Sequence, residues 1–381
     1  MYLKKPLPGA LDQHLAPLRD SRVLRTQRYP LLGVVFLAFC GILAGCNGWD
    51  ALAAFAKAKR GWFEQWFDLS DGTPCSDTFQ RVLQQLAPRP FAAAFEAWLA
   101  HLQTHLRGEL VALDGKAIRG AFTAAARTTP LHLLHAWGTR QKVLLGALAV
   151  EGAPGEIAGI ATLLAMLDAC GAVVATDANG CTQANAAAIV DAGADYLFGL
   201  KGNRGAIHAE TQALFASVPP ADEHLQVDKG HGRIEERRTQ TLPADLLPAA
   251  RRAAWKGLRT LVRTERSRTV GSQTTTERHY YLTSQAVDAA TVGAQIRTYW
   301  GVENELHWVL DATMGEDRCR VRHATAAENL ATLRRHALTL LRQPAAGRGS
   351  LAMKQRSVGW DETYLLKLLA SSAPSPRNQA V

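Results

Sequence analysis

The chain has 381 residues, which is too many for one ordinary hydrophobic core, so two or three domains are expected. Because 47% of the residues are apolar and 20% are charged, the composition excludes a mainly disordered chain. The formal net charge of +9 indicates a surface that attracts polyanions, of which nucleic acid is the commonest, although charge alone does not identify the partner.

The first part of the chain is predicted to be a helical domain over residues 1–107. Its stretch Leu31 to Gly45 is strongly apolar. This stretch is shorter than the roughly 18 residues that a membrane span needs. We therefore expect a buried helix here and no membrane association.

Two further helices are predicted before residue 107. Ser76 is expected to cap a helix that continues to Leu86 and stops before Pro88. A second helix is expected from Phe91 to Leu106, with apolar residues at core spacing. The exposed face of the first helix could contact DNA or simply be solvated; it carries Gln80, Arg81, Gln84 and Gln85.

After Gly108 the pattern changes to short apolar runs that predict a mixed sheet with helices on its faces, in a domain over residues 108–345. The expected strands are Leu110–Leu113, Leu131–Gly138, Val143–Val150, Ala172–Thr176 and Asp195–Leu200. The expected helices are Glu156–Ala169 and Gln183–Ala192.

A β-rich insertion is predicted at about 205–285, with antiparallel strands at Arg233–Thr241, Gly257–Arg266 and Thr275–Thr283. From Ala289 the chain is predicted to be helical through Leu310. A helix at Ala326–Leu341 should bury its leucines and expose Arg334 and Arg335. Residues 346–381 are expected to form a basic to polar tail.

Two aspartates follow predicted strands. Asp114 comes after the run LVAL, and Asp177 comes after AVVAT. Strand ends open onto ligand-binding crevices in α/β sheets, so a pair of carboxylates there favours a functional site. Each aspartate alone could equally cap a helix or close a turn.

A third carboxylate is expected from the helix that contains YWGVENELHWVLD. Glu303, His307 and Asp311 are spaced i, i+4 and i+8, so they share one face. Glu305 points about 200° away from Glu303. This acidic stripe could be solvated, or it could close a metal site over the two aspartates.

Three carboxylates suit Mg²⁺, for which Mn²⁺ could substitute, because hard cations prefer oxygen ligands and take remaining ones from water or phosphate. Two such ions can support an in-line displacement at phosphorus. This chemistry agrees with a basic protein that has three converging acids.

Several motifs, taken in their order along the chain, resemble the H-repeat-associated family of bacterial insertion-sequence transposases. The resemblance covers nearly the whole chain, and it depends on the set of motifs rather than on any single one. The segments are Leu113–Lys116 through Arg119–Gly120, Thr176–Ala178 through Gly180–Cys181, Asp195–Tyr196 through Leu200–Asn203, His231–Glu235, Trp300–Asn304 through Leu306–Trp308 to Asp311, Glu316–Asp317, Arg320–Arg322 and Ala327–Leu330. Residues 30–45 and 74–83 resemble the helical domain associated with that family.

The resemblance implies a ribonuclease-H-like catalytic domain in which Asp114, Asp177 and Glu303 are the catalytic and metal-binding triad. It implies metal-dependent cleavage and strand transfer at the ends of the element that encodes the protein. Double-stranded DNA, both element ends and target, is then the partner, bound by a homodimer or larger oligomer in the cytoplasm at the nucleoid.

The sequence departs from wider relatives of this family at two positions near Glu303. Those relatives often carry Arg four residues before the glutamate and Lys seven residues after it. This sequence has Tyr299 and Leu310 there. Arg297 and His307 are the candidates to replace them, and a hairpin intermediate is not predicted.

Several cationic or polar residues near the expected site are candidates for DNA contact. Lys201 and Asn203 lie in a glycine-rich turn that could bind phosphate or be solvated. His231 and Arg233 belong to a basic edge of the insertion. Beyond the catalytic helix, DNA contact is predicted for Arg318, Arg320 and Arg322.

Two other functions compete with the transposase. A DNA-binding remnant without transposition activity is one, although the presence of all three acids disfavours simple decay. A sugar hydrolase with paired carboxylates is the other, and it does not account for the basic charge. Metal-dependent cleavage of DNA would separate the enzyme from the remnant.

Overall fold

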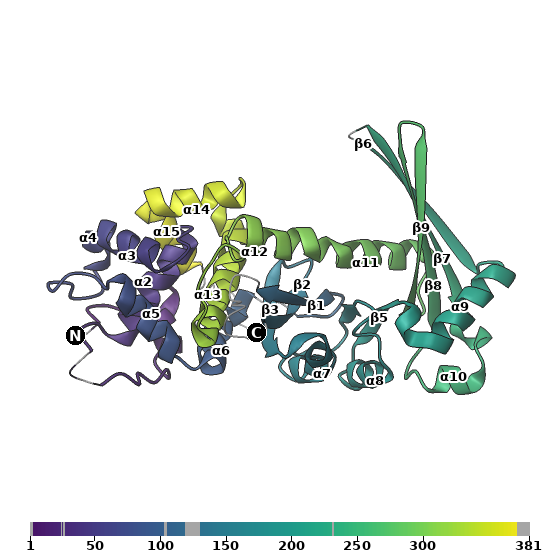
Figure 1. The fold of residues 1–381 in the computed structure, drawn as a ribbon, viewed down its shortest axis with the longest axis horizontal. Helices are drawn as coiled ribbons and strands as arrows, with labels where there is room; N and C mark the ends of the chain where they lie inside the picture. The colour runs from purple at the N-terminus through teal and green to yellow at the C-terminus, as the bar shows by residue number, and fades with distance from the viewer. Residues whose placement is uncertain are drawn as a thin grey trace, which may run out of the picture.

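The computed structural model describes residues 3–371 except residues 24, 26, 103–104, 119–129 and 231 (Figure 1). The strands are β1 Leu110–Ile118, β2 Leu131–Gly138, β3 Val143–Val150, β4 Val173–Thr176, β5 Asp195–Leu200, β6 Asp222–Gly230, β7 Arg233–Pro243, β8 Thr260–Val270 and β9 Gln273–Thr283. The helices are α1 Leu11–Leu15, α2 Leu31–Leu43, α3 Trp49–Ala58, α4 Arg60–Phe63, α5 Ser76–Gln85, α6 Pro88–Leu99, α7 Gly152–Leu164, α8 Gln183–Asp191, α9 Gly205–Ser217, α10 Ala249–Ala253, α11 Ala289–Val302, α12 Trp308–Ala312, α13 Ala324–Arg342, α14 Leu351–Trp360 and α15 Glu362–Ala370.

The described strands form one mixed sheet in the order β3-β2-β1-β4-β5-β9-β8-β7-β6. β4 lies parallel to β1 and to β5, whereas β2 is antiparallel to both of its neighbours. β5 then pairs antiparallel with β9, which starts a run of four long antiparallel strands. The predicted mixed sheet with flanking helices is confirmed.

The sheet is covered on both faces because its central strands are apolar on both sides. In β1, Leu110 and Ala112 lie in the core that also contains residues of α11 and α13. Val111 and Leu113 lie in the opposite core, which contains residues of α7 and α8. Strand side chains alternate between faces, so one continuous apolar run supplies both cores.

A helical body packs at one end of the sheet. The N-terminal helices α2, α5 and α6 share their core with α13, α14 and α15 (Figure 1). The apolar segment predicted as a buried helix is α2, which is buried along almost its whole length. Among the described helices, none has both the length and the apolar character that crossing a membrane needs.

Two predictions about this body are wrong. Arg334 and Arg335 are buried rather than exposed, because α13 is packed against the sheet on one side and the N-terminal helices on the other. The segment predicted as a tail forms α14 and α15, whose leucines join the core. Residues 372–381 lie outside the described part of the chain.

The boundaries of the two predicted N-terminal helices also differ. The N-cap of α5 is Cys75 rather than Ser76. α6 begins at Pro88, three residues before the predicted start, and ends at Leu99. Proline fits the first turn of a helix, where the backbone N–H has no intrahelical acceptor in any case. A short 3₁₀ turn at Ala100–Leu102 follows.

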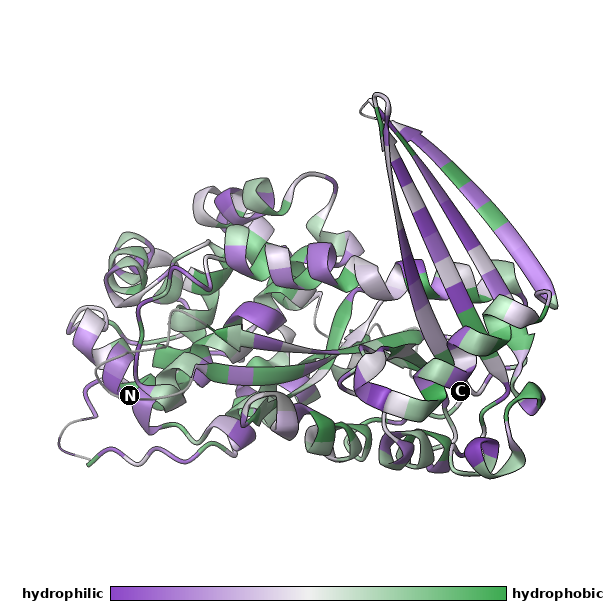
Figure 2. Cartoon of the chain, turned by 45° about the vertical axis from the view of Figure 1, so that its right-hand side comes forward, coloured by the Kyte–Doolittle hydropathy of each residue, from purple (hydrophilic) through white to green (hydrophobic). Residues whose placement is uncertain are grey.

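The four strands β6 to β9 form a blade that rises from the far end of the sheet (Figure 1). Three of them match the strands predicted for the insertion, but β6 was not predicted. Its sequence, DEHLQVDKG, is almost fully exposed, so it lacks the apolar run that signals a buried strand. Figure 2 shows that the distal part of the blade is mainly hydrophilic. Because β9 pairs with β5, the insertion extends the main sheet instead of forming a separate one.

Candidate functional site

Asp114 and Asp177 lie next to each other on one face of the sheet. β1 and β4 are parallel, with Leu113 opposite Thr176, so the residues that follow are neighbours. Side chains alternate along a strand, and Ala112 lies in the core shared with α11. Asp114 therefore points toward the face that α11 covers, and the charge of Asp177 is close enough to act on it.

The prediction that Asp114 ends its strand is wrong, whereas Asp177 does directly follow β4. β1 continues to Ile118 because β2 pairs with it along that length. Asp114 thus stands where pairing with β4 ends and pairing with β2 goes on. Arg119 and Gly120, part of the same motif, lie outside the described residues.

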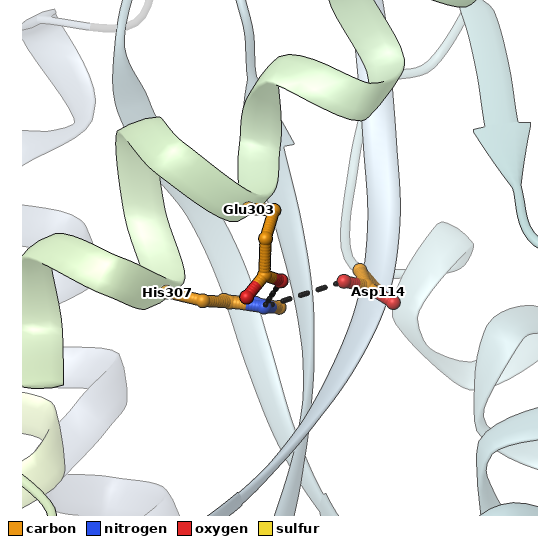
Figure 3. Close-up of side chains that lie close together, drawn as sticks. All are labelled: Asp114, Glu303 and His307. Atoms are coloured by element: carbon orange, nitrogen blue, oxygen red, sulfur yellow. Dashed lines mark hydrogen bonds and ion pairs between the residues drawn. The ribbon is translucent and has the colours of Figure 1, made fainter. Parts of the chain in front are cut away.

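Glu303 and His307 approach Asp114 from the helix above the sheet (Figure 3). The helix is continuous from α11 to α12, but residues 303–307 form a π-helical turn. Such wider turns are rare and occur frequently at functional sites. Nδ1 of His307 lies 3.2 Å from Oε2 of Glu303 and 3.4 Å from Oδ2 of Asp114. Glu305 points elsewhere, and its carboxylate pairs with Lys142 at 3.0 Å.

The three side chains differ in burial and charge. His307 is 7% exposed, whereas Glu303 is 67% exposed, so the cluster opens to solvent on the Glu303 side. Burial raises the pKa of Asp114 to about 7, and the negative charges of Asp177, Glu156 and Glu303 add to this rise. Burial lowers the pKa of His307 to about 4, although Glu303 opposes that shift, so the imidazole is neutral at pH 7.

Two ion pairs, one half-buried and one fully buried, lie beside this cluster. Lys116, on the same face of β1 as Asp114, donates to Oδ2 of Asp311 at 2.7 Å. Arg335 contacts both carboxylate oxygens of Glu316, and both side chains are essentially inaccessible. Nε of Arg335 also donates to Nε2 of His135 at 2.6 Å. These contacts hold the helix and the sheet in one arrangement.

Glu156 is a fourth carboxylate near the site, which the sequence analysis did not select. It stands on α7, below the opposite face of the sheet, and contacts His132. Its Oε1 lies 1.7 Å from the point that a Cβ on Gly115 would occupy. The absence of a side chain at Gly115 therefore lets this carboxylate approach the backbone beside Asp114. No spacing in the sequence signals this approach, because α7 reaches the strand only through the fold.

The loop after Asp177 is held by its own turn and by the next one. Oδ1 of Asp177 accepts from the backbone N–H groups of Asn179 and Gly180. Asn203 and Arg204 donate to backbone carbonyls of this loop at 2.7–3.1 Å. The turn predicted to be either phosphate-binding or solvated thus also positions the Asp177 loop, while Lys201 is exposed.

The other residues predicted to contact DNA differ in whether they form ion pairs or hydrogen bonds within the chain. Arg233 pairs with Glu235 in the blade, and Arg297 pairs with Asp228 at 2.8 Å. Arg318 donates to the carbonyl of Ala312. The structure does not bring Arg297 into the cluster around Asp114. His231 lies outside the described residues.

Arg320 and Arg322 are exposed on an extended segment before α13, and the intervening Val321 is buried. Among the described residues neither forms a hydrogen bond or an ion pair. Their charges are therefore not neutralised within the described part of the chain.

A groove of about 850 Å³ separates α11 from the blade and ends beside Glu303, at Gly301 and Asn304. Its lining includes the half-exposed indole of Trp300. The charged residues that line it are Arg237, Glu265, Arg266, Glu277 and Arg297. A groove lined by charges of both signs, whose three arginines are all ion-paired, thus leads to the cluster.

Comparison with known proteins agrees with this arrangement. Residues 105–340 match the family described as "Transposase DDE domain", and residues 13–99 match "DDE_Tnp_1-associated". The chain belongs to the DDE transposase family. It is 30% identical to "H repeat-associated putative transposase YhhI" of Escherichia coli strain K12, over 98% of this chain and all of that protein. It is 36% identical to "Uncharacterized protein in dhlA 3'region" of Xanthobacter autotrophicus, over 70% of this chain and 91% of that protein. The resemblance to H-repeat-associated transposases is confirmed.

The residues of the cluster fit a divalent cation, as is general for this family. The ligand atoms of Asp114, Glu303 and His307 all lie within 4.8 Å of one another. Burial raises the pKa of Asp114 and the neighbouring negative charges raise it further, so a cation would relieve that repulsion. Asp177 is adjacent but is not one of the three whose ligand atoms converge.

Proposed function

We propose that this transposase cleaves DNA and transfers strands at the ends of its own insertion sequence, using Asp114, Asp177 and Glu303 to hold Mg²⁺. The observation that carries the proposal is the convergence of Asp114 with Glu303 across about 190 residues of chain, beside Asp177. The strand order β3-β2-β1-β4-β5 supports assignment of this half of the sheet to the ribonuclease-H-like fold.

Each residue of the proposed triad is held in place by a different structural feature. Asp114 is fixed by the strand, Asp177 by its two backbone hydrogen bonds, and Glu303 by the π-helical turn. Bound Mg²⁺ would supply charge stabilisation for an in-line displacement at phosphorus, and Mn²⁺ could substitute. The exposed side of Glu303 leaves an open approach for a phosphodiester. Rigid placement of these oxygens lowers the cost of reaching the reactive geometry.

The DNA path that we propose follows the exposed cations. The groove along α11 leads duplex or single-stranded DNA toward Glu303, with Arg297 and Arg233 near its wall and the blade edge. Arg318, Arg320 and Arg322 lie beyond the other end of the catalytic helix, and Lys201 with Asn203 lie beside Asp177. Two element ends must be brought together for strand transfer, so the active form is a dimer or larger oligomer in the bacterial cytoplasm.

The alternative is a DNA-binding remnant, and one assay separates the two. A duplex that carries an element end is incubated with Mg²⁺, Mn²⁺, Ca²⁺ or excess chelator, and nicking is followed on a gel. Nicking is expected with Mg²⁺ and Mn²⁺ only, because Ca²⁺ holds its oxygen ligands less rigidly. Binding without nicking under all conditions supports the remnant, and nicking in excess chelator contradicts the metal-dependent mechanism.

The matched pair of variants is Glu303→Gln and Glu305→Gln. The first removes a charged ligand, so nicking should be lost while DNA binding in a gel shift is retained. The second affects a carboxylate that pairs with Lys142 on the other side of the helix, so nicking should be nearly normal. The opposite result would move the site to the other face of the helix.

A further inference from the structure

Nδ1 of His307 faces two carboxylates at once, and only the contact with Glu303 is within hydrogen-bond geometry. This nitrogen lies 3.2 Å from a Glu303 oxygen and 3.4 Å from an Asp114 oxygen. A charge-assisted hydrogen bond is shorter, about 2.7–2.9 Å. Two ligands of one octahedral ion, each about 2.1 Å from it, stand about 3 Å apart when adjacent. The two distances from Nδ1 are close to the separation of adjacent ligands of one ion, and the three ligand atoms all lie within 4.8 Å of one another.

The ring is also held in place before any ion arrives. His307 is 7% exposed, and its Nε2 is buried with no hydrogen-bond partner among the described residues. The ring lies 5.8 Å, centroid to centroid, from His135, which Arg335 and Glu316 anchor. The ring is therefore fixed by burial and packing, and not by a hydrogen bond to Nε2 from the described residues. Nδ1 is consequently the ring nitrogen that faces the open cluster.

We propose that His307 is a direct metal ligand through Nδ1, so that one ion is held by two carboxylates and one imidazole and Mn²⁺ binds more tightly than Mg²⁺. The inference rests on the proposed function, because it concerns the same metal site. Imidazole suits transition-metal ions, whereas Mg²⁺ strongly prefers oxygen, and Mn²⁺ accepts both. The nitrogen donor thus predicts a metal preference that three carboxylates alone do not.

The experiment uses the full chain without DNA and needs no turnover. Mn²⁺ is added at substoichiometric concentration, and electron spin echo envelope modulation is recorded. A ¹⁴N coupling from imidazole is expected, and it should change to a ¹⁵N pattern when histidine is ¹⁵N-labelled. The coupling should disappear in His307→Asn and persist in His323→Asn, which replaces an exposed histidine.

Calorimetric titration gives the second measurement. Loss of an outer-shell partner alone lowers metal affinity about 10–100-fold, so His307→Ala, which leaves no donor atom at the position of Nδ1, should weaken Mn²⁺ binding by at least about tenfold. Mg²⁺ affinity should fall less, and the preference for Mn²⁺ should shrink. His307→Asp should restore Mg²⁺ binding, because it returns an oxygen ligand to the same position.

The outcomes separate the inference from the proposed function. Mn²⁺ binding that requires Asp114 but shows no nitrogen coupling overturns the role of His307 and leaves the carboxylate site standing. Coupling that persists in His307→Asn assigns the nitrogen to another residue and also overturns it. Failure of either ion to bind the wild-type chain, together with cleavage in chelator, removes the proposed function as well. If His307→Asn does not fold, the ¹⁵N-labelled wild-type protein still decides whether histidine coordinates.

Discussion

The blade and the helical body beside the other end of the sheet use the same types of charged residue in different surroundings. In the body, Arg335 and Glu316 pair with side-chain exposures of 1% and 0%. In the blade, Arg278 and Glu265 pair with exposures of 63% and 27%. The body pair also contacts His135, the cross-strand neighbour of Asp114, whereas the blade pair faces solvent. Burial therefore decides whether an ion pair fixes the geometry of the site or remains available to ligands.

The energetic reason lies in desolvation. Removing one member of a buried pair leaves an unpaired charge in a medium of low dielectric constant, which is strongly destabilising. Exposed pairs are screened by water and salt, so most contribute little to stability. The sheet is thus rigid where the carboxylates converge and tolerant of change in the blade.

The largest expected effect comes from breaking the buried pair. Glu316→Gln should lower the free energy of unfolding by about 3–5 kcal/mol, because Arg335 would keep its charge without a counter-charge. Urea unfolding followed by circular dichroism measures this change. Arg278→Ala in the blade is the control and should leave the midpoint nearly unchanged. Equal losses in both variants would show that the blade and the body do not differ as described.

The next largest effect is a dependence of folding stability on pH, which arises from His336 in α13. Burial lowers the pKa of His336 to about 4, and the nearby Arg335 contributes to that shift. The unfolded chain takes up the proton near pH 6.5 and the folded chain only near pH 4. Stability should therefore fall by up to about 3 kcal/mol as the pH drops through this window.

His336 lines a cavity together with two carboxyl groups, those of Glu96 and Glu328. These carboxyl groups change the pH dependence of stability in the opposite direction. Burial raises the pKa of each, so the folded state takes up their protons first as the pH falls. Urea midpoints between pH 4 and 7 should show a shallower dependence in His336→Gln than in the wild type. An unchanged slope would remove His336 from the explanation.

A smaller loss is expected when the space beside Asp114 is filled. Gly115→Ala would place a methyl group on the carboxylate of Glu156, which must then move away from the strand. Overpacking of this kind costs about 1–3 kcal/mol, and the flexible end of Glu156 favours the lower part of that range. Thermal unfolding measures the change. Gly61→Ala is a control, because no atom lies within 4 Å of its added Cβ.

The smallest effect on stability, but a clear effect on DNA binding, is expected for the unpaired arginines. Arg320→Ala with Arg322→Ala should leave folding unchanged and reduce the slope of log affinity against log salt by about 1.8, at 0.9 for each phosphate contact. The control pair Arg238→Ala with Arg278→Ala lies outside the groove and removes charges that Glu223 and Glu265 already neutralise. Its salt slope should change less. Equal slopes for the two double variants would place the DNA elsewhere.

Local patterns predicted much of the secondary structure. β2 and β3 begin and end at the predicted residues, and the helix that carries Glu303 was placed correctly. These elements follow from apolar periodicity, which depends only on nearby residues. β6 escaped prediction because it is exposed, and the exposed placement of Arg334 and Arg335 failed because α13 is covered on both sides.

The sequence by itself determined the identity of the acids, the position of Asp177 directly after its strand, and the common face of Glu303 and His307. Only the tertiary structure decided which of these groups meet. Parallel pairing of β1 with β4 sets Asp114 beside Asp177, and the crossing of the helix above the sheet brings His307 to Asp114 and Asp311 to Lys116. Helical and strand periods extend over a few residues, whereas these contacts join segments about 60 and 190 residues apart through packing of both sheet faces.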